Sequence, residues 1–392
     1  MSAFDHIWRH GKIPIAWLLL SRFRSKLFTA LMGIVFASVL IHAQLGLREA
    51  LFESCISIFK NFNADIVVIN KVTVGSTSLQ GFDRNRLALF ERYPQVAETF
   101  PIRYDFVRWQ YPGSGKNRLA IMIGFNPRIQ AFNIKEVIDN QETLLVPDRI
   151  LYDELSRKEF GAVKDDFKRK DPLYAFVNDR RVRVTGLFRL GTSFSYDASL
   201  MTSITTFESL SDNLEGDVEI GLVRLTPGTN ASSFLDSVRN DIPGDVNVFT
   251  LKDFLDFEKS YWDQSKPIGF VFAFNAALGF IVGMLILYQI LYTDVSNHLS
   301  DFSTMLALAY TYGRIRIIVF QESLYLVAIG YPIGVIGSIL LFSLINNATG
   351  LQVKMSADRV LICFALVVLM SSISALMAMQ KLDDANPIEV FE

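Results

Sequence analysis

Four long apolar segments form the strongest pattern along this chain. They run over residues 27–47, 268–293, 317–345 and 360–380, and Glu322 is the one Asp, Glu, Lys or Arg inside them. A helix needs about 20 mostly apolar residues to cross the hydrocarbon core of a bilayer. Each segment therefore predicts a transmembrane helix, with charged or turn-forming residues at its ends.

The first apolar segment could also be compared with a cleaved signal peptide, because Arg22, Arg24 and Lys26 precede it. A signal core holds roughly 7–15 apolar residues and ends at a small-x-small cleavage site. The apolar run here is longer, and no clear site of that kind follows it. We predict a retained anchor helix.

Basic residues set the predicted orientation. The tail over residues 1–26 carries five of them against the single Asp5, and the positive-inside rule places such a tail in the cytoplasm. Helix parity then places the domain over 48–267 outside, the loop over 294–316 in the cytoplasm, the short loop over 346–359 outside and the tail over 381–392 in the cytoplasm.

The tail over residues 1–26 mixes tryptophan and isoleucine with basic residues, which predicts an amphipathic segment lying in the inner interface. His6 and His10 are four residues apart on it. A metal site needs more ligands than these, and no other histidine is near in the sequence. We predict no metal site there.

The region between the first two apolar segments has the composition of an aqueous domain, with strand-like and helix-like stretches in alternation. A turn at Pro112–Gly115 separates two extended stretches and predicts a hairpin. Further strands are predicted over 64–70, 181–189, 218–225 and 246–250, and helices over 83–93, 150–160, 231–238 and 251–261. The charged run 165–171 is expected to be a solvated loop. Two β-α-β pieces around a middle insertion predict an α+β domain, built either as one body or as two subdomains.

Composition and motifs argue against an enzyme. The outside domain contains no histidine and no nucleophile elbow, metal-ligand cluster or complete phosphate loop. The fragment Gly115–Asn117 is expected to be part of the hairpin turn. The net charge of -2 gives no reason to expect nucleic acid. We predict no catalytic, cofactor-binding or metal-binding residue in this chain.

The two cysteines are not expected to pair. Cys55 follows the first apolar segment, whereas Cys363 lies inside the last one. Both are interpreted as small hydrophobic residues.

Two pairs of small residues at four-residue spacing allow close approach of helices. They are Gly279 with Gly283 and Gly330 with Gly334. Packing within one subunit and a homodimer face both explain them, and a homodimer face would be best placed on the second apolar segment. Pro332 predicts a kink in the third.

The inner loop contains a short apolar stretch, Thr304–Tyr312, after a polar run. It is too short to span a membrane and too apolar to be left in water, which predicts a short interfacial helix. This helix either docks onto a cytoplasmic partner or rests on the bilayer. Glu322 either reaches the interface, pairs with a neighbouring arginine, or ties the inner loop to the third helix.

This layout resembles the MacB-like (type VII) ABC transporter permeases, and among them the DevC-type permeases of cyanobacteria. The segments that carry the resemblance are Ile13–Leu18, Gln44–Phe52, Asp301–Tyr310, Gln321–Ser323 and Asn386–Glu389. The family usually has a lysine and a glycine where this chain has Leu306 and Ala309. The resemblance covers nearly the whole chain, although the outside domain matches by layout more than by motif.

The resemblance implies a homodimeric permease of the bacterial, cyanobacterial-type inner membrane, with both termini in the cytoplasm. It implies a separate ABC ATPase that carries the ATP and Mg, a periplasmic membrane fusion protein, a TolC-like outer-membrane channel and an amphiphilic or lipid-like cargo such as glycolipid. The expected ATPase-coupling residues are Asp301, Thr304, Met305, Leu306, Ala307, Leu308, Ala309, Tyr310 and Glu322.

Two alternatives remain open at this point. An FtsX-like regulator would use the same motion to switch a periplasmic cell-wall hydrolase, and no adaptor would accompany it. A membrane-tethered enzyme would show activity in its outside domain, for which the sequence offers no catalytic constellation.

Overall fold

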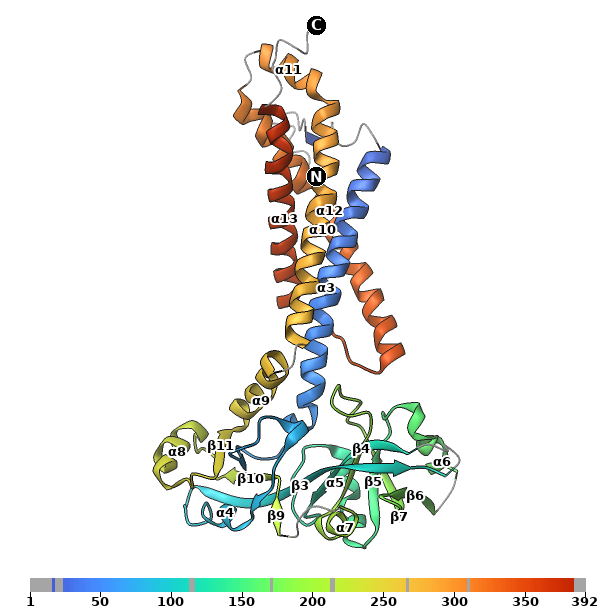
Figure 1. The fold of residues 1–392 in the computed structure, drawn as a ribbon, viewed down its shortest axis with the longest axis vertical. Helices are drawn as coiled ribbons and strands as arrows, with labels where there is room; N and C mark the ends of the chain where they lie inside the picture. The colour runs from blue at the N-terminus through green and yellow to red at the C-terminus, as the bar shows by residue number, and fades with distance from the viewer. Residues whose placement is uncertain are drawn as a thin grey trace, which may run out of the picture. The chain divides into compact units, whose positions relative to one another are not determined.

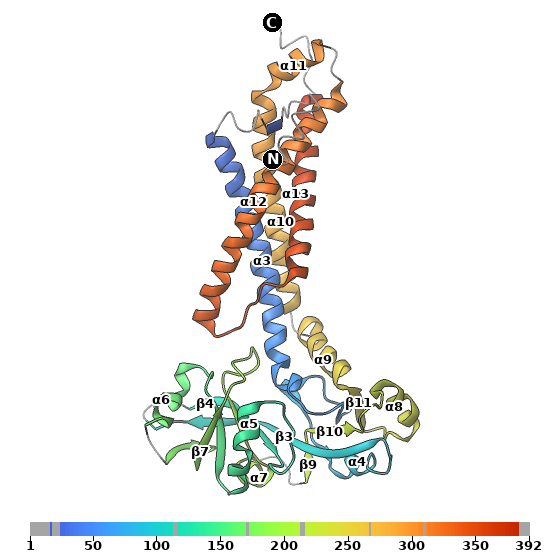
Figure 2. The same ribbon diagram turned by 180° about the vertical axis from the view of Figure 1, so that it is seen from behind.

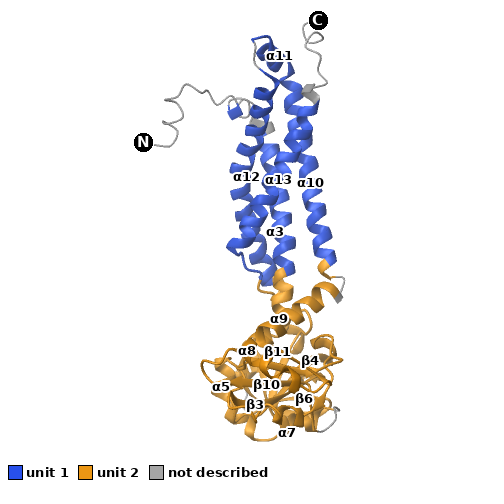
Figure 3. Ribbon diagram, turned by 90° about the vertical axis from the view of Figure 1, so that its left-hand side faces the viewer, with its two compact units in different colours: residues 1–48, 270–347, 353–392 blue, residues 49–269, 348–352 orange. Residues whose placement is uncertain are grey.

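The computed structural model describes residues 16–17, 24–112, 117–169, 172–211, 216–265, 268–308 and 311–383. The chain divides into two compact units (Figure 3). Unit 1 comprises residues 1–48, 270–347 and 353–392, and unit 2 comprises residues 49–269 and 348–352.

Unit 1 is a helical bundle. Its long helices are α3 (Arg24–Lys60, which continues into unit 2), α10 (Ile268–Asn297), α12 (Tyr312–Thr349) and α13 (Ala357–Asp383). These 4 helices are long and apolar enough to cross a membrane. The short helix α11 (Leu299–Ala307) lies at one end of the bundle (Figures 1 and 2). Each long helix carries both buried and exposed apolar residues. The buried ones pack together into one apolar core of the bundle.

The first half of unit 2 is an antiparallel sheet with strand order β11-β1-β10-β3. The strands are β1 (Ile66–Asn70), β3 (Val96–Gln110), β10 (Ile220–Leu225) and β11 (Val246–Thr250). With α4 (Asn85–Ala88) after β1 and α8 (Ala231–Val238) after β10, the connectivity is the ferredoxin-like split β-α-β motif.

Local caps explain where the helices of this half begin. The Asn230 side chain accepts a hydrogen bond from the Ser233 amide at 3.0 Å and starts α8. The Thr250 hydroxyl accepts from the Asp253 amide at 3.1 Å and starts α9 (Leu251–Ser260). Such oxygens satisfy amides that have no partner in the first turn of a helix. Because α9 follows a capped start directly after β11, its position is set by the sheet.

The second half of unit 2 is a closed barrel inserted between β3 and β10. Its strands follow the order β3-β4-β8-β5-β7-β6, and β6 pairs back onto the end of β3 through Trp109 with Val177. The added strands are β4 (Arg118–Phe125), β5 (Arg149–Asp153), β6 (Leu173–Val177), β7 (Arg180–Phe188) and β8 (Ser199–Ser203). Closure removes the free sheet edges of this half.

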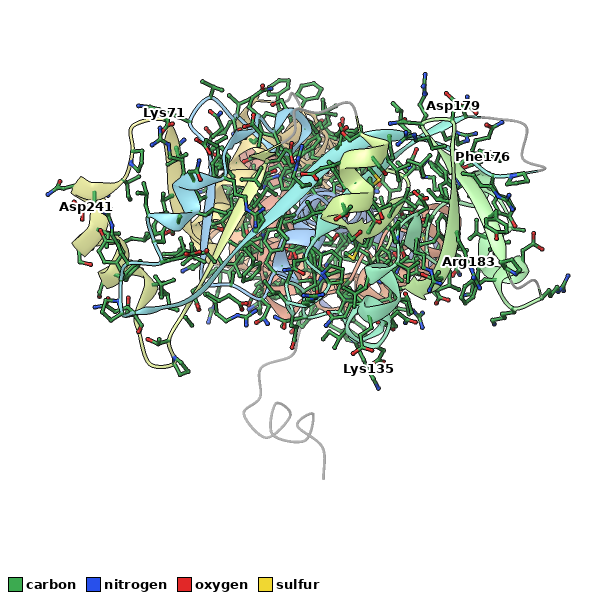
Figure 4. All side chains as sticks on the ribbon, turned by 90° about the horizontal axis from the view of Figure 1, so that it is seen from below. Lys71, Lys135, Phe176, Asp179, Arg183 and Asp241 are labelled. Carbon is green, nitrogen blue, oxygen red and sulfur yellow. The ribbon has the colours of Figure 1, made fainter. Side chains whose placement is uncertain are left out.

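Strand β3 belongs to both halves. It crosses unit 2 from the side marked by Lys71 and Asp241 towards the side marked by Phe176 and Asp179 (Figure 4). Where one sheet gives way to the other, the buried Arg103 of β3 contacts Glu219 between Nε and Oε2 at 3.0 Å. The same carboxylate accepts from the Tyr104 amide at 2.9 Å. This buried ion pair joins the two halves at their shared strand.

The smaller elements complete unit 2. Strands β2 (Phe82–Asp83) and β9 (Asp217–Val218) pair with each other. The remaining helices are α5 (Lys135–Asn140), α6 (Val163–Phe167) and α7 (Ile204–Leu210). Figures 1 and 2 show α8 at one side of this unit and α6 at the other.

The predicted fold class is confirmed: four apolar helices carry a large α+β domain inserted between the first and the second. The predicted hairpin is also present as the antiparallel pair β3 and β4.

Three local predictions were wrong. Residues 150–160, expected to be helical, form the buried strand β5 and a turn, because Ile150–Tyr152 pair with β7 and β8 inside the barrel. The helix expected over 83–93 is limited to the four residues of α4, followed by turns. The solvated loop expected over 165–171 is helical over 165–167, where α6 ends; residues 168 and 169 are exposed as expected, and residues 170 and 171 lie outside the described residues.

Candidate functional site

The short helix α11 is the most distinctive element of unit 1. Helix α10 ends at Asn297, and His298 then caps α11 with backbone angles outside the helical region. The Phe302 amide still donates to the His298 carbonyl at 2.9 Å, and the His298 amide donates to the Asp294 carbonyl at 3.1 Å. The chain therefore bends at a defined point, which we call the α10–α11 junction.

Helix α11 has two unlike faces. Phe302 and Ser303 are buried, and Met305 and Leu306 are half-buried against the apolar core of unit 1. The opposite face is exposed and consists of Asn297, Ser300, Asp301, Thr304, Ala307 and Leu308. We call it the α11 stripe. Leu308 is 70% exposed at its end.

The residues expected to couple to an ATPase differ in their exposure. Asp301, Thr304, Ala307 and Leu308 lie on the exposed stripe. Met305 and Leu306 pack inward, so they hold the helix in place instead of presenting a surface. Ala309 and Tyr310 fall outside the described residues. Helix α11 covers Leu299–Ala307 and begins five residues before the stretch 304–312 expected from the sequence. The polar residues that precede this stretch belong to the helix, because they form its exposed face.

Glu322 is buried completely, at 0% exposure, on α12. It does not reach the interface, and no described arginine pairs with it. The group that faces it is the carboxyl of Asp294 from the last turns of α10. Among the described residues, neither Glu322 oxygen receives a conventional hydrogen bond. Asp294 is the first residue of the expected inner loop, so Glu322 and that loop meet here.

The His298 ring adds to this group. Its Nδ1 lies 2.9 Å from Asp301 Oδ2, and its Nε2 lies 3.9 Å from Asp294 Oδ1. Asp294, His298, Asp301 and Glu322 thus form one set of ionisable groups, which we call the acidic cluster. Sequence reasoning singled out Asp301 and Glu322 and missed the other two. The spacing of Asp294, His298 and Asp301 on successive turns was the available signal.

The four glycines at four-residue spacing all face α3 of the same chain. A Cβ at Gly283 would lie 2.5 Å from the Ala37 Cβ, and one at Gly334 would lie 2.6 Å from the Ser38 Cβ. A Cβ at Gly330 would lie 2.9 Å from Ile34, whereas one at Gly279 would meet Leu40 at an ordinary contact distance of 3.5 Å. Their role in this structure is close packing of α10 and α12 against α3.

Polar contacts also join α3 to the other helices of unit 1. The Tyr331 hydroxyl donates to the Val360 carbonyl at 2.5 Å, and it lies 3.4 Å from His42 Nε2. The bond reaches α13, and the His42 contact reaches α3. Tyr331 immediately precedes Pro332, where α12 loses a backbone hydrogen bond. Helices α3, α12 and α13 therefore meet at this point.

In unit 2, the outer end of α3 is tied to α9. Lys259 Nζ lies 2.7 Å from Glu53 Oε1, and Lys60 contacts the same carboxylate. Burial alone would raise the pKa of Glu53, but the two lysines outweigh it and lower that pKa. Because α9 precedes α10 in the chain, the two segments that lead out of the membrane helices are linked within one unit.

The described residues hold neither a cluster of His, Cys, Asp and Glu suited to a metal nor a disulfide. No group of 3 or more such side chains has metal-site geometry among them. Cys55 and Cys363 are both buried as free thiols.

Comparison with known proteins gives one family match. Residues 273–387 match the model of the FtsX-like permease C-terminal family. These residues contain most of α10, all of α11 and α12, and α13. The match covers less than a third of the chain, and it supports an ABC-type permease, a multi-pass transport subunit. A search of curated protein sequences finds no match.

Three solved structures similar to part of the chain are two extracytoplasmic domains and one domain of a permease. The periplasmic region of MacB from Actinobacillus actinomycetemcomitans is 12% identical, and the alignment covers 50% of this chain and 92% of that one, with a TM-score of 0.35. The extracellular domain of the ABC-type transporter YknZ from Gram-positive bacteria is 10% identical, with coverages of 47% and 98% and a TM-score of 0.31. A domain described as part of a permease from Porphyromonas gingivalis is 16% identical, with coverages of 48% and 88% and a TM-score of 0.31.

Proposed function

We propose that this chain is the permease subunit of a MacB-like, type VII ABC exporter. In this proposal a separate ATPase binds the α11 stripe from the cytoplasm, and ATP-driven closure moves α11. Helices α10 and α12 then transmit the motion to the outside domain. The observation that carries the proposal is an exposed helix face, ending in Leu308, within the region that matches the permease family.

The route for such a motion has support in named contacts. Helix α11 is anchored through Met305 and Leu306, so a force on its exposed face reaches the bundle. Glycine contacts join α10 and α12 to α3, and close-packed interiors transmit displacement instead of absorbing it. In unit 2, Glu53 and Lys259 hold the continuing segments α3 and α9 together.

The finer parts of the proposal concern assembly and cargo. We propose a homodimer in a bacterial inner membrane of the cyanobacterial DevC type, with both termini in the cytoplasm. A periplasmic membrane fusion protein and a TolC-like outer-membrane channel would complete the export path for an amphiphilic, lipid-like cargo. ATP and Mg would reside on the ATPase.

The first test uses the tagged full-length protein in mild detergent, with captured proteins identified by mass spectrometry. Recovery of an ABC ATPase together with a membrane fusion protein is the expected result. An ATPase with a cell-wall hydrolase and no adaptor would establish the FtsX-like regulator instead and remove the transport claim.

Replacement of Leu308 by glutamate tests the docking face. Burying a leucine in an interface contributes about 1.5–3 kcal/mol, so L308E is expected to weaken capture of the ATPase at least roughly tenfold. Val72 in unit 2 is 68% exposed against 70% for Leu308, so V72E is a matched control that should leave capture unchanged. Wild-type capture by L308E would remove the stripe from the docking site.

A further inference from the structure

The loop between β7 and β8 presents an exposed phenylalanine on a fixed backbone. Residues 190–196 contain no Asp, Glu, Lys or Arg, and Phe194 is 50% exposed. Asp153 accepts hydrogen bonds from the amides of the first two loop residues, at 3.2 and 2.8 Å. The Phe194 amide donates to the Ser54 hydroxyl of α3 at 3.1 Å. The Phe194 ring therefore stays at the surface, because turning it inward would break these bonds.

The Phe194 ring lies close to the point where α10 begins. It packs edge-to-face on the Trp262 ring, with 5.6 Å between the ring centroids. Trp262 forms a small apolar cluster with Cys55 and Tyr261, and Ile268, the first residue of α10, packs against this cluster. The exposed ring is thus separated by one side chain from the cluster that holds the start of a membrane-length helix.

The connection between α12 and α13 meets the same loop. Gly350 directly follows α12, and residues 348–352 belong to unit 2. A Cβ at Gly350 would lie 3.3 Å from the Thr192 hydroxyl oxygen. Together with the bond to Ser54 on α3 and the contact near α10, this places the loop 190–196 beside the ends of three membrane-length helices, by contacts that all lie within unit 2.

A second exposed loop, residues 73–77, meets the same apolar cluster. The Thr77 hydroxyl lies 2.9 Å from the Tyr261 hydroxyl, and a Cβ at Gly75 would lie 2.5 Å from the Tyr261 ring. Val74, next to Gly75, is 58% exposed. No Asp, Glu, Lys or Arg occurs over residues 72–82. Two loops without charged residues, each with an exposed apolar side chain, therefore converge on Tyr261 and Trp262.

We propose that the loops 73–77 and 190–196 rest on the surface of the bilayer that the helices span, with Val74 and Phe194 among the lipid headgroups. Apolar side chains gain free energy by leaving water, and the interface accepts aromatic rings readily. The three adjacent helix ends favour lipid over a soluble partner, because they bring these loops to the membrane surface in every folded chain. The inference goes beyond the proposed function and needs neither an ATPase nor a cargo.

The test is a depth measurement with spin labels on the full-length protein, reconstituted alone in phosphatidylcholine nanodiscs. The label is attached in F194C and, separately, in V74C. L145C is the matched control, because Leu145 is also 50% exposed. Leu145 precedes β5, whose opposite end holds the loop 190–196 through Asp153. The control label is therefore separated from the loop by the length of a strand.

Label depth is read from collisions with oxygen, which partitions into lipid, against collisions with a water-soluble nickel complex. The labels in F194C and V74C should lie within about 5–10 Å of the boundary between headgroups and acyl chains, the depth of interfacial apolar groups. The label in L145C should collide mainly with the nickel complex. Cys55 and Cys363 are buried, so the wild type treated with the label supplies the background.

A second measurement asks whether the two loops act together. Adding F194E to V74C should shift the Val74 label towards water, whereas adding L145E should leave its depth unchanged. A water-like reading in F194C would overturn the proposal, and if F194C does not fold, the reading in V74C decides in the same way. Dipolar broadening between F194C labels would show that a second copy covers Phe194, which also overturns it. Because no ATPase is present, failure here is separate from failure to capture one.

Discussion

The two units of this protein differ in which groups lie beside a buried carboxyl. In unit 2, Glu219 is buried beside the guanidinium of Arg103 and also accepts a backbone amide. Burial raises the pKa of Glu219, and Arg103 opposes that rise. In unit 1, Glu322 is buried with another carboxyl as its neighbour.

The difference is whether a buried carboxyl has a cation beside it. The Arg103 guanidinium compensates the buried Glu219 carboxylate, and this pair joins the two halves of unit 2 at β3. A buried carboxyl without such a cation depends on a proton, which solvent conditions can remove. Unit 2 also holds fully buried carboxyls without a basic partner among the described residues. Asp153 accepts hydrogen bonds from the Leu190 and Gly191 amides instead, and Glu258 on α9 is the other case.

The largest expected effect comes from removing the buried Arg103–Glu219 ion pair. Replacing Arg103 by methionine leaves Glu219 buried without its cation, which should cost about 3–5 kcal/mol of stability. Thermal unfolding of the full-length protein in detergent measures it. Arg108 and Asp179 form an ion pair with side chains 60% and 71% exposed, so R108M should change stability by about 0–1 kcal/mol. Equal losses in the two variants would contradict the distinction.

The second largest expected effect is a pH dependence of stability caused by the buried Glu258. Burial raises the pKa of Glu258 from 4.5 to about 7, and Ser76 opposes this only in part. The folded state therefore binds a proton more tightly than the unfolded state. The stability of unit 2 should fall as the pH rises from about 4.5 to about 7, by about 2–3 kcal/mol, and level off above that range.

Replacing Glu258 by glutamine should remove most of that pH dependence and raise stability at about pH 8, where the wild-type carboxylate is ionised. Glu98, which is partly exposed in an ion pair with Arg224, serves as a control, and E98Q should keep the wild-type slope. Unfolding temperatures of the wild type, E258Q and E98Q, measured at a series of pH values, test this prediction. An unchanged slope in E258Q would show that Glu258 is hydrated in solution.

The smallest expected effect separates two glycines of α10. A Cβ at Gly283 would lie 2.5 Å from the Ala37 Cβ and 2.6 Å from the Met370 sulfur, so G283A should destabilise the bundle by about 1 kcal/mol or more. A Cβ at Gly279 would meet Leu40 at 3.5 Å, an ordinary contact. G279A should therefore be neutral or stabilising by up to about 1 kcal/mol, from helix propensity. If the two variants had the same unfolding temperature in nanodiscs, close packing on α3 would not be the role of Gly283.

The sequence alone was sufficient for features that depend on neighbouring residues. The apolar lengths of α3, α10, α12 and α13 were readable because a membrane span needs no distant partner for its backbone. The hairpin of β3 and β4 and the β10-α8-β11-α9 stretch were readable because turns, caps and periodicity are local signals. These features predicted the four membrane helices and the large domain between the first and the second.

Tertiary structure alone decided the features that join distant residues. Residues 150–153 look amphipathic along the sequence, but pairing with both β7 and β8 makes them a strand. Arg103 meets Glu219 from 116 residues away, and Asp294 meets Glu322 only because α10 and α12 pack together. Sequence spacing carries no record of such contacts, because they depend on how whole elements pack and on which charges that packing removes from water.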